Sequence, residues 1–350
     1  MAFGFAVVGC GMIARFHCKA IADIPGARVA ALVGRSRASA ERLAHEMGLE
    51  GLLCTDNLEE ALKTPGVDAL IVTTPSGVHM ESAVLAARAG KHVVVEKPLE
   101  ITAARCDAII EACDKAGVLL CTIFPSRFGD ANRELKSAID AGRFGRLTLG
   151  ETTVKWWRSQ QYYDEGGWKG TQALDGGGAL MNQAIHNVDL LLWMMGPVES
   201  VAAFTGTLAH DRIEVEDTAV ASIRFKNGAL GVIQATTSVW PGLSKTIAIH
   251  GDKGSVEIEQ DDLLLWNYQN ELPGDSGIRE RFAVKSGSSG GSSNPGAISH
   301  VGHTRQLADF IDAIKENRKP FVDGAEGRRS VELIEAIYQS ARTGTIVRLA

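Results

Sequence analysis

The stretch Phe3-Gly-Phe-Ala-Val-Val-Gly-Cys-Gly-Met-Ile-Ala14 decides the fold of the amino-terminal part of the chain. Its first half is an apolar run, which predicts a buried strand. Its second half has GxGxxA spacing, which predicts a tight turn that opens a helix. In a parallel sheet such a turn lets the backbone approach a pyrophosphate at the helix amino terminus. We predict that a dinucleotide binds there to Gly9, Gly11, Met12, Ile13 and Ala14. The alternative is a plain glycine turn.

Short apolar runs alternate with amphipathic segments through residue 123, which predicts a parallel sheet covered by helices on both faces. The strand-like runs are residues 5–8, 29–33, 69–73, 92–95 and 119–123. Helical segments begin near Met12, Ser39, Asn57, Gly77 and Thr102. The predicted fold class is therefore α/β, with a doubly wound Rossmann domain in residues 1–123.

The sequence pattern changes after residue 123. Successive strand-like stretches with period-two alternation there predict an open, mainly antiparallel sheet. These stretches are residues 147–157, 218–225, 229–239, 246–251 and 254–259. Helices are predicted at 131–140, 304–316 and 328–343, so residues 124–350 form an α+β domain. The Ser/Gly-rich residues 286–296 predict a mobile loop or lid, or more simply a solvated linker.

Composition narrows the classes of partner. The chain has 350 residues, a net charge of −6 and no basic stripe, so a nucleic-acid partner is not expected. It has no apolar run long enough to span a membrane and no basic leader, which predicts a cytoplasmic protein without a membrane partner. All six cysteines lie in the first 121 residues without metal-ligand spacing. They are predicted to be buried thiols, and no metal site is expected.

The end of the second strand bears on the choice of cofactor. An NAD-selective domain carries a carboxylate there for the ribose hydroxyls, but this chain has Gly34-Arg35-Ser36-Arg37. Two guanidinium groups and a hydroxyl suit a 2′-phosphate, so Arg35, Ser36 and Arg37 predict NADP slightly ahead of NAD. The alternative is a solvated arginine pair.

Two further loops follow strands, on the side where open α/β sheets bind ligands. One contains Thr74, Pro75 and His79, and the other contains Glu96 and Lys97 before Pro98. We predict that these residues, together with Arg127 beyond the last strand-like run, contact the cofactor. Lys97 also has the chemistry to donate to a substrate oxygen, although by itself it is more simply interpreted as a solvated loop charge.

Residues 175–189, Asp-Gly-Gly-Gly-Ala-Leu-Met-Asn-Gln-Ala-Ile-His-Asn-Val-Asp, predict a helix with a polar stripe beside an apolar one. Asn182, His186 and Asp189 follow i, i+4, i+7 spacing, which places them on one face. A partly desolvated imidazole with amide and carboxylate neighbours suits general acid/base catalysis. The alternatives are a core histidine that is merely satisfied, and an Asp189 that pairs with an arginine.

Aromatic and charged side chains alternate from Lys155 to Lys169, as is common in carbohydrate sites. We predict that Arg158, Tyr163 and Lys169 hold hydroxyl or carboxylate groups of a substrate. The competing interpretation is a packing or subunit-interface cluster, and of Trp156 and Trp157 only one can face a given side.

Taken together, these motifs and the closing Pro320-Phe-Val-Asp-Gly324 resemble the Gfo/Idh/MocA family, over essentially the whole chain. The resemblance implies a Rossmann domain followed by a substrate-binding and oligomerisation domain, in a homodimer or homotetramer. It also implies NAD(P)-linked oxidation or reduction of sugar and cyclitol carbons. By the same resemblance Lys97 matches the catalytic lysine and His186 the catalytic histidine. Asn182 departs from an aspartate found in inositol dehydrogenase-like members, and an amide cannot titrate.

The expected activity is hydride transfer between a nicotinamide and a secondary alcohol or ketone carbon of a sugar, glycoside or cyclitol. In this hypothesis His186 is the acid/base, Lys97 polarises the substrate oxygen and Asn182 orients the substrate. Asp189 is a further candidate for orienting the substrate and the imidazole. Three alternatives stay open. They are a nucleotide-sugar enzyme like UDP-N-acetylglucosaminuronate 3-dehydrogenase, a redox-neutral NAD-dependent glycosidase, and a non-catalytic sugar-sensing regulator.

Overall fold

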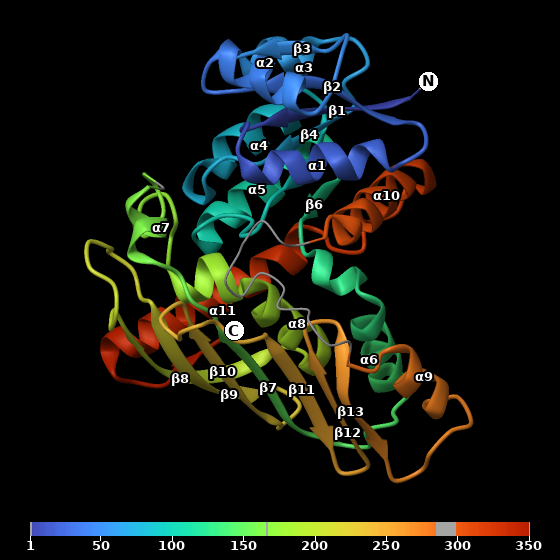
Figure 1. Ribbon diagram of the computed structural model, residues 1–350, viewed down its shortest axis with the longest axis vertical. Coiled ribbons are helices and arrows are strands. Elements are labelled where there is room, and N and C mark those ends of the chain that lie inside the picture. Colours follow the sequence, from blue (N-terminus) through green and yellow to red (C-terminus); the bar gives the residue numbers. More distant parts are fainter. Residues whose placement is uncertain (1, 166, 285–298, 350) are drawn as a thin grey trace. The chain divides into compact units, whose positions relative to one another are not determined.

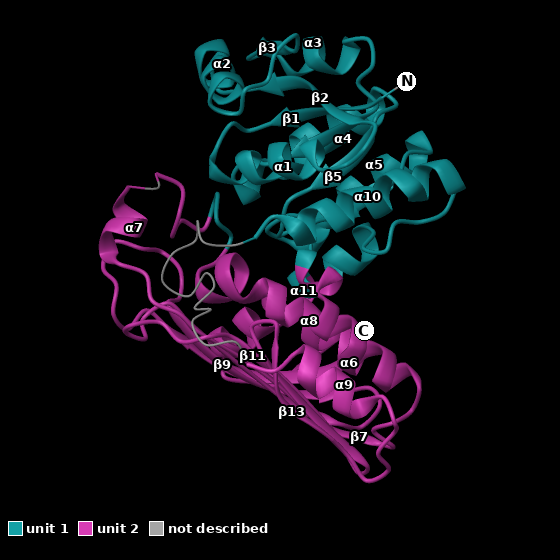
Figure 2. Ribbon diagram, turned by 45° about the vertical axis from the view of Figure 1, so that its right-hand side comes forward, with its two compact units in different colours: residues 1–125, 173–176, 299–331 teal, residues 126–172, 177–298, 332–350 magenta. Residues whose placement is uncertain are grey.

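The computed structural model describes residues 2–165, 167–284 and 299–349, which form two compact units (Figure 1 and Figure 2). Unit 1 comprises residues up to 125 together with 173–176 and 299–331. Unit 2 comprises residues 126–172, 177–298 and 332–350, of which the described part is discussed below. The predicted loop or linker at 286–296 lies outside the described residues.

Unit 1 contains a six-stranded parallel sheet, as the alternating pattern predicts. Its strand order is β3-β2-β1-β4-β5-β6, which is doubly wound about β1 and β4. The strands are β1 (Phe3–Val8), β2 (Ala27–Val33), β3 (Leu53–Thr55), β4 (Ala69–Val72), β5 (His92–Val95) and β6 (Leu120–Thr122). The three-residue β3 was not predicted, because the apolar run on which it lies, residues 52–54, is shorter than the others.

One face of this sheet is covered by α1 (Met12–Ala22), α2 (Arg37–Glu46) and α10 (Val301–Glu316), which share a core that includes Cys18, Leu43 and Phe310. The other helices are α3 (Leu58–Lys63), α4 (His79–Arg88) and α5 (Ala103–Ala116), and the last two pack side by side. The placement of α10 differs from the predicted division at residue 123. Helix α10 belongs to unit 1 because its apolar stripe packs against α1.

Unit 2 is built on an eight-stranded sheet in the order β13-β12-β11-β7-β10-β9-β8-β14. All neighbouring strands pair antiparallel except β7 and β10, which confirms a mainly antiparallel sheet. The strands are β7 (Leu147–Lys155), β8 (Val198–Gly206), β9 (Thr218–Phe225), β10 (Leu230–Thr236), β11 (Thr246–Gly251), β12 (Gly254–Glu259), β13 (Asp262–Tyr268) and β14 (Val347–Arg348).

Helix α8 (Ile185–Met195) lies on β7 and β11. It approaches the sheet closely at Gly150, where an added Cβ would lie 2.6 Å from the Met195 side chain. The remaining helices are α6 (Asp130–Asp140), α7 (Gln160–Asp164), α9 (Asp275–Arg281) and α11 (Gly324–Thr343), which begins in unit 1 and ends in unit 2.

The predicted single helix through residues 175–189 is wrong in detail. Residues 179–184 form a π-helix, η3 (Ala179–Ala184), which continues directly into α8. The i→i+5 hydrogen bonds of a π-helix put more residues in a turn than an α-helix does. Asn182 therefore lies in the π-helix and His186 in the α-helix that follows it, instead of both lying in one regular α-helix.

Two expectations from composition can be compared with the described residues. All six cysteines are free thiols, and four of them are buried while Cys10 and Cys54 are half-buried. Among the described helices, none is both long enough and apolar enough to cross a bilayer.

Candidate active site

The glycine turn between β1 and α1 has the backbone that a phosphate cradle requires. Gly9 has φ +99°, and a Cβ there would lie 2.6 Å from the Thr73 carbonyl oxygen, so glycine is needed for both reasons. A Cβ at Gly11 would meet nothing within 4 Å, and no side chain caps the amino terminus of α1. Met12 is exposed, Ile13 is half-buried and Ala14 is buried, so the first turn is open on one side.

The loop after β4 is held by its own polar groups. The Thr73 hydroxyl donates to the carbonyl oxygens of Val8 and Gly9, at 2.8 and 2.7 Å. His79 is buried, and its Nε2 and Nδ1 lie 2.9 and 3.0 Å from the carbonyl oxygens of Thr74 and Pro98. Burial lowers the pKa of His79. In these contacts His79 ties the loop that contains Thr74 and Pro75 to the loop that contains Lys97.

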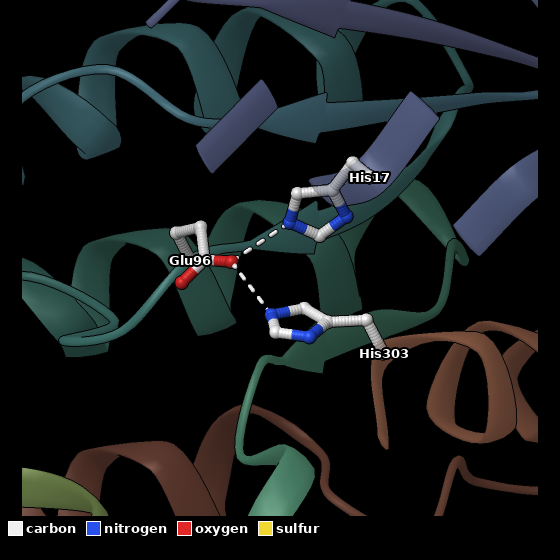
Figure 3. Close-up of side chains that lie close together, drawn as sticks. All are labelled: His17, Glu96 and His303. Carbon is white, nitrogen blue, oxygen red and sulfur yellow. Dashed lines mark hydrogen bonds and ion pairs between the residues drawn. The ribbon is translucent and has the colours of Figure 1, made fainter. Parts of the chain in front are cut away.

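Glu96 is turned into the interior of unit 1, where it joins three elements (Figure 3). Its Oε1 lies 2.7 Å from Nε2 of His17 on α1 and 3.6 Å from Nε2 of His303 on α10. Its Oε2 accepts the backbone N–H of Lys97 at 3.1 Å. Burial opposes ionisation, but the hydrogen bonds and charge interactions with both histidines hold the pKa of Glu96 well below its usual range. A carboxylate so engaged orients the backbone of Lys97.

His17, Glu96 and His303 are ligand types that could hold a metal ion, and their candidate ligand atoms lie within 4.8 Å of one another. The contact of 2.7 Å between His17 and Glu96 is that of a hydrogen bond. Ligands of a tetrahedral zinc ion are about 3.3 Å apart. Metal-bound histidines also donate their second ring N–H to an acceptor, whereas Nδ1 of His17 and Nδ1 of His303 have no partner in the described structure. The geometry fits a hydrogen-bonded carboxylate better than a metal centre.

The segment that carries the predicted catalytic histidine lies in unit 2. From residue 177 to 192 every side chain is buried except Asn182 and His186, which are half-buried. Met181, Ile185 and Val188 are fully buried, so the apolar stripe packs as predicted. The two predicted catalytic residues of this segment are therefore those that a small molecule could reach.

Asp189 does not share that exposure. It is fully buried and accepts two hydrogen bonds from Arg127, Nε to Oδ2 at 2.8 Å and Nη2 to Oδ1 at 2.6 Å. Of the alternatives for Asp189, pairing with an arginine is the one observed, although inside the core instead of at the surface. Arg127, predicted as a cofactor contact, is the buried partner of this bidentate pair.

A chain of hydrogen bonds links Arg158 to Asn182. Arg158 Nη2 donates to Gln183 Oε1 at 2.8 Å, and Gln183 Nε2 donates to Asn182 Oδ1 at 2.6 Å and to Tyr162 Oη at 3.1 Å. Arg158 is buried, and desolvation lowers its pKa. Gln183, which the sequence analysis passed over, fixes the orientation of the Asn182 amide. Its position next to Asn182 was the only local signal.

The other aromatic-segment candidates are placed differently. Tyr163 is buried, and its hydroxyl lies 2.9 Å from that of Thr237. Lys169 Nζ lies 3.8 Å from the centre of the Tyr162 ring, a cation–π contact. Trp156 is buried while Trp157 is half-buried, as the strand alternation requires.

Comparisons with known proteins decide the family. The model of the oxidoreductase family with an NAD-binding Rossmann fold matches residues 3–124, and the GFO/IDH/MocA C-terminal domain matches residues 132–257. The chain belongs to the Gfo/Idh/MocA family. It is an enzyme, an NAD-linked oxidoreductase, and the resemblance seen in the sequence is confirmed.

Several members of the family match over nearly the whole chain. The WlbA dehydrogenase from Bordetella pertussis, solved in complex with NADH and UDP-GlcNAcA, is 35% identical with a TM-score of 0.87, and the match covers 100% of this chain and 99% of that one. The myo-inositol 2-dehydrogenase of Thermotoga maritima is 28% identical over 98% of this chain and 97% of its own. The 1,5-anhydro-D-fructose reductase of Ensifer adhaerens is 28% identical over 97% and 96%.

The residues of unit 1 fit the dinucleotide that the family binds. Besides the open glycine turn, the Thr74 hydroxyl oxygen is buried and has no protein partner in the described structure. At the end of β2, the Ser36 side chain caps α2 and Arg37 pairs with Glu41 at 2.8 Å. Of the three residues predicted to bind a 2′-phosphate, Arg35 is exposed and has no hydrogen bond or ion pair among the described residues.

Proposed function

We propose that this enzyme transfers hydride between a nicotinamide cofactor and a secondary alcohol or ketone carbon of a sugar or cyclitol. His186 is the general acid/base, Lys97 polarises the substrate oxygen and Asn182 orients the substrate. The observation that carries this proposal is the exposure of Asn182 and His186 alone in an otherwise buried segment of a Gfo/Idh/MocA chain. The anchoring of the Lys97 backbone by Glu96 supports the role of the lysine.

Each side chain has a defined task in alcohol oxidation. A bound oxidised nicotinamide would supply the acceptor for the carbon-bound hydrogen and its electron pair. His186 takes the hydroxyl proton, so the alcohol becomes a ketone and the imidazole becomes an imidazolium. The Lys97 ammonium donates a hydrogen bond to the same oxygen and stabilises its developing negative charge. In the reductive direction His186 returns the proton.

Within this substrate class we favour a nucleotide-linked sugar acid. The support is the 35% identity, over the whole chain, to the WlbA dehydrogenase from Bordetella pertussis, whose structure contains UDP-GlcNAcA. A second WlbA dehydrogenase, solved in the same type of complex, matches at the same identity. An amide at position 182 suits this assignment because Asn182 has neutral donors and acceptors for hydroxyl or amide groups of a sugar.

For the cofactor, we propose that NADP is accepted and slightly preferred. The absence of an acidic residue at positions 34–37 and the exposed Arg35 support this choice. The two WlbA dehydrogenase structures contain NADH, so the test includes both NAD and NADP.

The test follows absorbance of reduced nicotinamide against free sugars, cyclitols, glycosides and nucleotide-sugars, with NAD and NADP. We expect turnover of a sugar or nucleotide-sugar, lost by about a hundredfold or more in Lys97→Met and in His186→Asn. His186→Asn should keep the cofactor affinity of the wild type. His45→Asn, a change of the same kind at an exposed site on α2, is the control.

Other results would favour one of the alternative functions or contradict the catalytic assignment. Cleavage of a nitrophenyl glycoside without net formation of reduced cofactor would favour the redox-neutral glycosidase. Binding of a sugar without turnover in either direction would favour the sensor. An active Lys97→Met/His186→Asn double variant would remove the proposed catalytic assignment.

A further inference from the structure

The amino terminus of the segment that carries Asn182 and His186 is built around a buried carboxylate. Three successive backbone N–H groups, those of residues 178, 179 and 180, donate to Glu216. Gly178 donates to Oε2 at 3.0 Å, Ala179 to the Glu216 carbonyl oxygen at 3.0 Å and Leu180 to Oε1 at 2.8 Å. The first N–H groups of a helix have no partner inside the helix, and Glu216 accepts the first two of η3 together with that of the preceding Gly178.

A second element holds the carboxylate from the other side. Tyr338 on α11 donates its hydroxyl to Glu216 Oε1 at 3.0 Å. The glycines that precede η3 make this approach possible. A Cβ on Gly177 would lie 2.1 Å from the Tyr338 hydroxyl, and a Cβ on Gly178 would lie 1.8 Å from the Glu216 carbonyl oxygen. The Gly-Gly pair at 177–178 is therefore required by the contact with Glu216 and Tyr338.

From this observation we infer that Glu216 is a positioning residue for the reaction: it fixes the start of η3 and thereby the placement of Asn182 and His186. Asn182 follows Leu180 by two residues, and its own N–H donates to the Gly178 carbonyl oxygen at 3.0 Å. The carboxylate of Glu216 also lies at the amino-terminal end of the helical segment, where it interacts favourably with the positive end of the helix dipole. This inference rests on the proposed roles of Asn182 and His186.

The Glu216 carboxyl group also lies where it can exchange protons with a cavity. Glu216 borders a cavity of about 370 Å³ in unit 2, whose charged and titratable walls are Glu214, Tyr338 and Arg342. Burial raises the pKa of Glu216 to about 7, although the hydrogen bonds from Leu180, Gly178 and Tyr338 act in the opposite direction. A proton on the carboxyl group removes one acceptor from the backbone N–H groups. The placement of η3 therefore responds to pH near neutrality.

The deciding variant is Glu216→Gln, which keeps the shape but places an NH₂ group against one of the N–H donors. We expect kcat to fall by about tenfold or more, because a small misplacement of a reacting group is costly. KM should rise as well, because Asn182, the residue proposed to orient the substrate, is displaced together with His186. The inflection near pH 7 that Glu216 contributes to the kcat profile should disappear. Glu214→Gln, the same change on an exposed wall of the same cavity, should leave kcat and the profile unaltered.

A spectroscopic readout separates this inference from the proposed function. In protein labelled with ¹⁵N-histidine, the His186 signals are assigned by their loss in His186→Asn. We expect Glu216→Gln to shift these signals and Glu214→Gln to leave them in place. Retained turnover in His186→Asn would overturn the catalytic role of His186, whereas unaltered His186 signals in folded Glu216→Gln would overturn the positioning role of Glu216.

Tyr338→Phe provides the test if Glu216→Gln does not fold. Without the hydroxyl, a hydrogen bond that favours the carboxylate is lost, so the Glu216 pKa rises and the inflection moves to higher pH. An inflection at the wild-type position in folded Tyr338→Phe overturns the inference.

Discussion

At the scale of single residues, the candidate site depends on side chains that are half-buried and held by fully buried neighbours. Gln183 holds the Asn182 amide, and Glu96 holds the Lys97 backbone. The reactive groups were identified in the sequence because their types are unusual in an apolar segment or before a proline. Their supports were not predicted in that role. Glu96 was predicted as a cofactor contact, and no local pattern connects it to His17 and His303, which lie far away along the chain.

Arg35 provides a residue-scale prediction about the cofactor. Replacing the exposed guanidinium by a carboxylate, Arg35→Asp, should repel a 2′-phosphate and offer an acceptor to a ribose hydroxyl. We expect the preference for NADPH over NADH, measured as a ratio of Kd values by fluorescence titration, to fall by about tenfold or more. Arg42→Asp, at an exposed residue on α2, is the control and should leave the ratio unchanged. A wild-type enzyme that binds NADH far more tightly than NADPH would contradict the proposal.

The triad of His17, Glu96 and His303 provides a prediction about stability and pH. Burial lowers the pKa of His17 below 6.5, and the histidines hold the pKa of Glu96 well below 4.5. On acidification the unfolded chain therefore takes up protons before the folded chain does. Stability that is present at neutral pH is lost as the pH falls through the unfolded values, first of histidine and then of glutamate.

The measurement is Tm between neutral pH and about pH 5. The Tm of the wild type should fall over this range. His17→Gln should have a lower Tm at neutral pH, and its Tm should depend less steeply on pH. Removing one partner of a buried hydrogen bond costs about 1–3 kcal/mol. His45→Gln, at an exposed histidine, should follow the wild-type curve. A steeper slope in His17→Gln would be inconsistent with a neutral buried imidazole.

At the scale of elements, periodicity predicted most helices and strands, because buried apolar side chains recur at fixed intervals in both. The strands β3, β8, β13 and β14 were not among those predicted. β3 lies on the apolar run Leu52-Leu-Cys54, which is shorter than the run 119–123 that predicted the equally short β6. The π-helix η3 was predicted as α-helix because Met181, Ile185 and Val188 repeat as an α-helical stripe would. What distinguishes η3 is the anchoring of its first N–H groups by Glu216, a residue from a distant part of the sequence.

Gly178 allows a direct test of this element. In Gly178→Ala the new Cβ would lie 1.8 Å from the Glu216 carbonyl oxygen, and backbone atoms cannot yield as a flexible side chain can. We expect a loss of about 1–3 kcal/mol in the free energy of unfolding, measured by urea titration. Gly274→Ala is the matched control, because a Cβ there meets nothing within 4 Å and the φ of −82° suits alanine. Equal stability of the two variants would show that η3 tolerates a displaced start.

At the scale of the whole molecule, the exposed apolar residues of unit 2 bear on assembly. Phe204 on β8 and Val220 on β9 are directly paired across the two strands and are 83% and 47% exposed. Leu230 on the adjacent β10 is 49% exposed. Leu230 pairs with Arg224, four residues along β9 from Val220. Exposed apolar side chains on one sheet face are typical of an interface. We propose that this face joins copies of the chain into a homodimer or homotetramer.

The prediction for assembly concerns Phe204→Lys. A charge in the centre of an apolar interface is costly to desolvate, so we expect a smaller particle by light scattering than for wild type. Leu208→Lys is the control, since Leu208 is 75% exposed but lies in the loop after β8. A monomeric wild type, or dissociation by Leu208→Lys alone, would contradict the proposed face.

The assembly of unit 1 from three separate stretches of chain has a practical consequence for protein engineering. A fragment truncated after residue 125 would lack Leu307, Phe310 and Ile311, and the apolar side chains they cover on α1 would be open to solvent. Such a fragment should aggregate. Grafting a foreign cofactor domain onto this enzyme therefore requires that the donor's counterpart of α10 be transplanted along with its amino-terminal half.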